Sequence, residues 1–302
     1  MFYYKKNDER SKKSSNDNNN KVFWIISVLS WLFLLVTSWL SIGLPNSNEY
    51  KYFWLTTSLK TSYDNDIKYY PLSMHIVFHY FVFILTFTIA TIGFLIYITY
   101  RDDNSILDGM LNKISQFHFI PLLCISALFI IGESKESPNT GMYIINFIFT
   151  IIGLVSLILI KIKTNIESPW YANFLIKRGA YSCFIALLIY NIGFNFTYYG
   201  IYEIDDGKPL ENWKTGCGIA FPIFIGLFNL ALSIIFQDII LAFMNLMIYI
   251  GMIINFYAID KDTRSEHNAT GEGIIDIVMI SLSGCTILFL ALIYKQRLYN
   301  DS

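Results

Sequence analysis

The feature that most constrains this chain is a series of long apolar stretches, of which only the last contains a charged residue, Asp276. Crossing the roughly 30 Å hydrocarbon core of a bilayer takes about 20 helical residues. Because lipid cannot hydrogen-bond the backbone, each such stretch is expected to be a helix. Seven stretches are long enough: Val22–Leu44, Met74–Tyr100, Gly141–Ile160, Gly179–Tyr202, Gly216–Phe236, Ile239–Ile259 and Gly273–Tyr294.

A shorter eighth stretch lies at residues 117–132. Pro121 near its start suits the first turn of a helix, and residues 114–132 carry no charge. We count it as a span. The predicted fold class is therefore all-α, a polytopic integral membrane bundle of about eight transmembrane helices.

A helical hairpin is predicted where two spans are separated only by Gln237 and Asp238. As one helix, the combined run would extend about 65 Å, roughly twice the bilayer core. The chain must therefore reverse direction at this polar pair.

Basic residues predict the topology. With eight spans and the N-terminus inside, inner segments hold 14 of the 22 Lys and Arg, whereas leaving out the short span lowers this number to 13. Both termini are therefore expected in the cytosol, with the protein in the plasma membrane or an endomembrane.

The chain divides into a tail, a membrane domain and a short end. Residues 1–21 are polar and predict a disordered cytosolic tail. The next stretch is too long for a signal peptide and lacks a small-residue cleavage site, so it is expected to be a signal anchor. Residues 22–294 form the predicted eight-span domain, and residues 295–302 a cytosolic C-terminus. A weak 4+4 duplication, over 22–162 and 179–294, is a further hypothesis.

Two sequons bear on this topology. Asn268-Ala269-Thr270 lies in the predicted outer loop 260–272, so Asn268 is expected to carry a glycan. The second sequon, at Asn195, lies within a span and is expected to be unused.

Segments outside the spans suggest interactions. The outer loop 45–73 contains aromatic and Thr-rich runs that predict a β-hairpin and a surface for protein partners. Inside, residues 107–117 and 168–178 have the apolar spacing and basic flanks of helices that lie at the headgroups. The favoured interpretation is that both are ordinary connectors anchored by aromatic residues.

Polar residues within the spans are the candidate site residues. We favour interhelical hydrogen bonds as their role, with a polar pathway for a solute or ion as the alternative. Asp238 and Asp276 are expected near the interface, where charge costs little, and this weakens the pathway hypothesis. The candidates are Asn191, Asn195, Asn229, Asn245, Asn255 and Asp276.

His75 and His79 share a helix face through their i, i+4 spacing, as zinc ligands can. The alternative is that both are interfacial residues whose polar tips reach water. The other histidines are His118 and His267. His118 lies at the far end of the third span and no later span contains a histidine, so no metal or haem ligand set is completed. We predict no metal site and no cofactor.

Function is the least constrained property. The chain has no CxxC, HExxH, GxSxG or Gly-rich phosphate loop, so no catalytic residue and no enzymatic activity are predicted. The net charge of −1 argues against a nucleic-acid partner. An interaction or scaffold membrane protein is the favoured hypothesis, with the lipid bilayer as its surroundings. The alternative is a small-solute or ion transporter or channel that uses the Asn-bearing second half. A seven-span receptor would place the cationic tail outside, against the charge rule.

Overall fold

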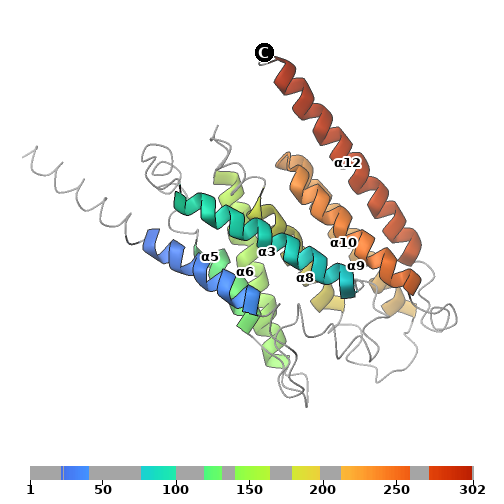
Figure 1. Cartoon of the computed structure of the whole chain (residues 1–302). Helices are drawn as coiled ribbons and strands as arrows, with labels where there is room; N and C mark the ends of the chain where they lie inside the picture. Colours follow the sequence, from blue (N-terminus) through green and yellow to red (C-terminus); the bar gives the residue numbers. More distant parts are fainter. Residues whose placement is uncertain are drawn as a thin grey trace, which may run out of the picture.

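The computed structural model describes residues 22, 24–40, 76–99, 119–130, 140–163, 179–197, 212–258 and 272–300. Apart from short turns, these residues are helical and include no strand. The predicted all-α class is confirmed for these residues, and each predicted span overlaps one helix (Figure 1). The helices are Trp24–Leu40, α3 (Ile76–Thr99), α5 (Phe119–Ile130), α6 (Thr140–Lys163), α8 (Ala180–Thr197), α9 (Asn212–Ile235), α10 (Ile239–Ala258) and α12 (Glu272–Asn300).

Three of these helices are long and apolar enough to cross a membrane, fewer than the eight spans expected. They contain the segments Ile144–Ile162, Ile239–Ala258 and Gly273–Gln296. The other five described helices are also apolar, but their apolar segments are only 10–17 residues long. This composition indicates a membrane-embedded protein.

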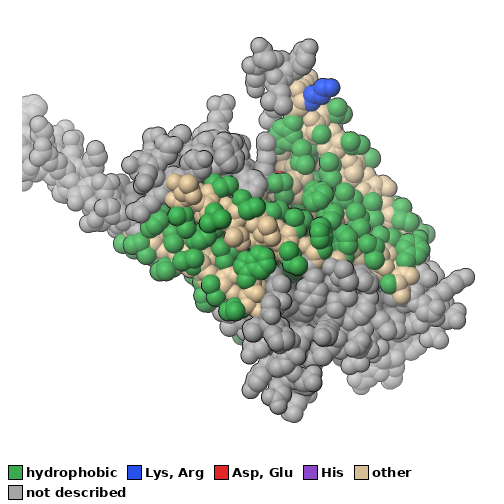
Figure 2. Space-filling view, in the orientation of Figure 1, with side chains coloured by type: hydrophobic (Ala, Val, Ile, Leu, Met, Phe, Trp, Pro, Cys, Tyr) green, Lys and Arg blue, Asp and Glu red, His purple; other side chains and the backbone are tan. Residues whose placement is uncertain are grey.

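The surface of the described helices is apolar. Exposed side chains include Leu29, Leu95, Phe224 and Leu288. Figure 2 shows hydrophobic side chains covering most of the described face, with basic side chains only near the C-terminal end of α12. Soluble monomers rarely expose apolar surface so extensively, whereas a lipid environment favours it.

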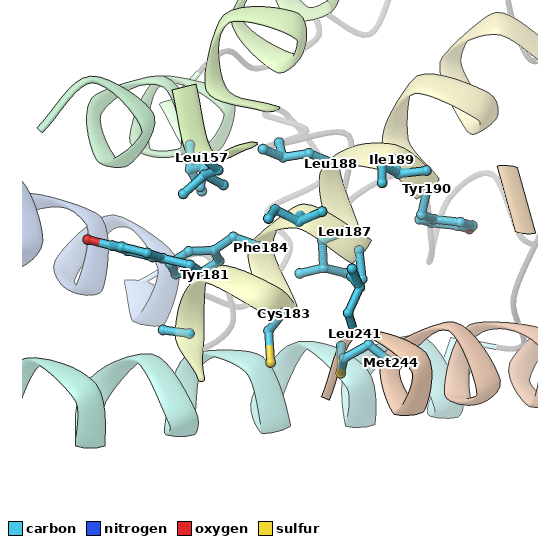
Figure 3. Packing of buried hydrophobic residues seen from close by; sticks show 14 of the residues in the cluster. Leu157, Tyr181, Cys183, Phe184, Leu187, Leu188, Ile189, Tyr190, Leu241 and Met244 are labelled. Atoms are coloured by element: carbon cyan, nitrogen blue, oxygen red, sulfur yellow. The ribbon is translucent and has the colours of Figure 1, made fainter. Parts of the chain in front are cut away.

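Helix α8 forms the centre of the bundle. All of its residues from Ala180 to Asn191 are buried, as expected of a helix that is apolar on every side. Figure 3 shows its side chains pointing in several directions, with Leu157 of α6 on one side and Leu241 and Met244 of α10 on another. Contacts with α3, α6, α9 and α10 surround it.

The hairpin between α9 and α10 occurs where the sequence predicts it. The Asp238 N–H donates to the Ser233 carbonyl at 2.8 Å, and the Gln237 N–H donates to the Ile234 carbonyl at 3.1 Å. This pair of bonds ends α9 as a Schellman motif, whose C′ residue adopts positive φ. Gln237 has φ of 50°, and Asp238 Oδ1 then caps α10 by accepting from the Leu241 N–H at 3.1 Å.

Two pairs of helices that follow one another in the described chain run antiparallel. On α10 and α12, Asn245 bonds Ser283 while Tyr294 bonds the carbonyl of Gln237, so increasing residue number on one helix matches decreasing number on the other. Figure 1 shows α12 lying alongside α10. The same relation holds for α6 and α8, where Asn191 bonds Thr150 and Lys161 bonds Ser182.

Several predictions fall outside the described residues. These are the disordered tail, the β-hairpin in loop 45–73, the two surface helices and the sequon at Asn268.

Candidate functional site

A buried ion pair joins α6 to the α9–α10 turn. Lys161 lies in the last turn of α6, Ser182 in the first turn of α8, and Asp238 between α9 and α10. The Lys161 ammonium pairs with Asp238 Oδ2, and their side chains are only 2% and 0% exposed. Three elements that are distant in sequence therefore meet at one end of the bundle, which we call the ion-pair end.

Hydrogen bonds complete this centre. The Ser182 hydroxyl donates to Asp238 Oδ2 at 2.5 Å and accepts from Lys161 Nζ at 2.9 Å. Asp238 Oδ1 caps α10, so both carboxylate oxygens are used. The Lys161 ammonium also lies 5.4 Å from the centroid of the Phe236 ring, within cation–π range. The buried charges are thus compensated on several sides, which burial of a charge requires.

This centre corrects one sequence-based expectation. The predicted span ended at Ile160 and placed Lys161 in an inner loop, but α6 continues through Lys163 and Lys161 is buried. Asp238 and Asp276, which were expected near the interface, are both buried within the bundle. Helical spacing was an available signal, because Lys161 follows Leu154 and Leu157 on the buried face of α6.

The separation of Ser182 and Lys161 resembles that of a Ser–Lys nucleophile pair. In such a pair the lysine acts as a base toward the serine. Here the Ser182 hydroxyl donates a hydrogen bond to Asp238, and the Lys161 ammonium donates to both Ser182 and Asp238. The arrangement therefore favours an ion pair over an activated nucleophile.

A second polar cluster joins α6 and α8. Asn191 Nδ2 donates to Thr150 Oγ1 at 2.7 Å and to Asn146 Oδ1 at 3.2 Å, and Thr150 donates to the Asn146 carbonyl at 2.8 Å. All three side chains are buried. These are interhelical hydrogen bonds of the kind that hold membrane bundles together.

A third polar contact joins α10 and α12. Asn245 Nδ2 donates to Ser283 Oγ at 3.0 Å, and Ser283 donates to the Met279 carbonyl. By contrast, three amide atoms have no hydrogen-bond partner among the described residues. They are Asn229 Nδ2, Asn229 Oδ1 and Asn245 Oδ1. Asn229 and Asn245 are fully buried, so this capacity is unused in the interior.

The remaining candidates are distributed as follows. Asn255 and Asp276 are buried on α10 and α12. Asn195 lies on α8 and His79 on α3, but their side chains are outside the described set, as are His75 and Asn268 entirely. The described residues contain no group of three or more His, Cys, Asp or Glu that could hold a metal ion.

Comparison with known protein families, with curated proteins and with solved structures finds no match. Two features distinguish this bundle. One is the buried ion pair at one end, and the other is the set of amide groups on α9 and α10 that have no hydrogen-bond partner.

Proposed function

We propose that this chain is a membrane transport protein that spans the bilayer with eight helices and moves a small solute or ion. The observation that carries the proposal is the buried pair of Lys161 and Asp238. Ionisable groups inside membrane bundles are rare, and they commonly mark substrate pathways or moving parts.

The ion pair is not needed for packing alone. Replacing a buried pair by well-packed apolar residues is often neutral or even stabilising, because desolvation offsets the Coulombic attraction. A bundle that only held partners could close this end with leucines. A charge pair instead forms a contact that can break when water hydrates both groups. The end of a transporter that opens and closes requires such a contact.

The position of the pair suits a closed end. It ties α6 and α8 to the α9–α10 turn, and all three elements are at predicted cytosolic ends of spans. Tyr294 of α12 donates to the carbonyl of Gln237 in the same turn. We infer that the ion-pair end faces the cytosol and is shut in this conformation.

The antiparallel relations between consecutive helices support eight alternating crossings. The helix Trp24–Leu40 runs against α3, since Trp31 stacks with Phe94 while Trp39 donates to Thr91.

The scaffold hypothesis depends on loop 45–73 and on the surface helices, which also lie outside the described residues. No described contact favours it. Transport is therefore the function that the described geometry supports best.

The test uses the purified full chain in lipid vesicles. Potassium, sodium and proton flux would be followed with entrapped dyes, and urea and glycerol entry by light scattering. We expect at least one probe to cross faster than in protein-free vesicles and in vesicles with heat-inactivated protein. A folded, reconstituted protein that passes none of them would favour the scaffold hypothesis.

A further inference from the structure

We propose that the buried surface between α9, α10 and α12 binds a small neutral solute with two N–H donors and a carbonyl acceptor, of which urea is the simplest probe. The inference rests on the proposed transport function and names the class of its substrate. It is carried by the unpartnered amide groups of Asn229 and Asn245.

One close contact fixes the relative depth of the three helices. A Cβ atom on Gly226 of α9 would lie 2.6 Å from the Tyr249 hydroxyl of α10 and 2.8 Å from the Met279 sulfur of α12. Tyr249 donates that hydroxyl to the carbonyl of Pro222, also on α9. Gly226, Tyr249 and Met279 therefore form one layer.

The polar residues form the next layer toward the α9–α10 turn. From Gly226, Tyr249 and Met279, one turn along each helix in that direction reaches a polar residue on the same face, roughly 4.5–6 Å away. This direction runs toward higher residue numbers on α9 and α12 and toward lower numbers on α10, because α10 is antiparallel to both α9 and α12. The residues reached are Asn229, Asn245 and Ser283.

Two observations agree with this layer. Asn245 donates directly to Ser283 across α10 and α12. Asn229 and Asn245 are also placed symmetrically in the hairpin, each eight residues from Gln237. All three side chains are fully buried, so they lie inside the bundle and not at its lipid surface.

The unused groups define the chemistry of the ligand. Two amide oxygens, on Asn229 and Asn245, can accept hydrogen bonds, and the Asn229 amide nitrogen can donate them. A cation would use the oxygens but face the Asn229 N–H donors, and an anion would face two oxygens. A neutral solute that both donates and accepts can satisfy all three groups.

Further polar residues extend along the same helices from this layer. Ser233 lies one turn beyond Asn229 and Thr286 lies three residues beyond Ser283, both toward the α9–α10 turn, while Asp276 lies two turns from Ser283 in the opposite direction. All three are buried. A solute released from the amide layer would therefore meet hydroxyl groups on its way to the ion-pair end.

Binding and flux are tested separately. The full-length protein in detergent would be melted with and without urea at non-denaturing, millimolar concentrations. We expect urea to raise the melting temperature of the wild type by a few degrees, as a ligand that binds the folded state does, and to leave Asn229→Leu unshifted. Absence of a shift in the wild type would overturn the site.

Flux supplies the second readout in reconstituted vesicles. Asn229→Leu and Asn245→Leu should each slow urea entry about tenfold, the factor equivalent to one hydrogen bond. Asn191→Leu is the matched control, since its amide is bonded between α6 and α8, and it should keep wild-type entry.

The outcomes separate the two proposals. Cation flux without urea entry, water flux alone, or unchanged urea entry in Asn229→Leu would overturn the site while leaving transport standing. Urea protection of the wild type without flux of any probe would support the site and contradict transport.

Discussion

At the scale of single residues, the ion pair makes each partner depend on the other. Asp238 accepts from Lys161, from Ser182 and from the backbone of α10. Removing only the ammonium leaves a buried carboxylate without its countercharge. Removing both charges while keeping the shape leaves a neutral amide that can still cap α10.

Lys161→Met should therefore lower stability by about 3–5 kcal/mol, the usual effect of breaking a buried pair. Adding Asp238→Asn should recover most of this loss, because no unpaired charge remains. Thermal unfolding of both variants in detergent measures the difference. Equal destabilisation of the single and double variants would show that the pair is not the source of the effect.

Gly226 allows the closest approach of α9 to Tyr249 and Met279. Gly226→Ala should cost about 1–3 kcal/mol through overpacking, because the new methyl group displaces a hydroxyl that is bonded to Pro222. The matched control is Gly284→Ala on α12, whose Cβ would meet no atom within 4 Å. The melting temperature should fall for the first variant and not for the second.

At the scale of elements, the turn between α9 and α10 joins two helices without glycine. Gln237 adopts the left-handed conformation that most non-glycine residues avoid. The Schellman bonds, the Asp238 cap and Tyr294 together hold this conformation in place.

Gln237→Gly should consequently stabilise the protein by up to about 1 kcal/mol, because glycine adopts positive φ without a Cβ penalty. Gln237→Ala keeps the Cβ and serves as the control. A higher melting temperature for the glycine variant than for the alanine variant is expected. The reverse order would contradict the left-handed turn.

The sequence predicts the elements better than their contacts. The helices and the reversal at Gln237 follow from hydropathy and from the length that a bilayer allows. Lys161 was missed because a charge beside an apolar stretch is normally assigned to a loop. The layer of Asn229, Asn245 and Ser283 depends on the register of three helices, and register is set by tertiary contacts such as that of Gly226.

At the scale of the whole molecule, the proposed topology has eight crossings with the tail and the C-terminus in the cytosol. Tags at the two ends should both be digested by protease added to the cytosolic side of sealed membranes. Termini on opposite sides would exclude an even number of crossings.

Glycosylation checks the same topology from the other side. Asn268 should carry a glycan when the protein is made in a secretory membrane, so Asn268→Gln should increase gel mobility. Asn195→Gln should not, because α8 is predicted to span. A mobility change with Asn195→Gln would contradict the placement of α8 in the membrane.

The pair of Lys161 and Asp238 is proposed to close one end of a transport protein. The most direct measurement is the flux through vesicles containing Lys161→Met/Asp238→Asn, using the probe that the wild type transports. We expect this variant to stay folded but to transport at a clearly altered rate, faster if the pair only holds the end shut. Wild-type flux through a folded double variant would show that the pair does not close the end.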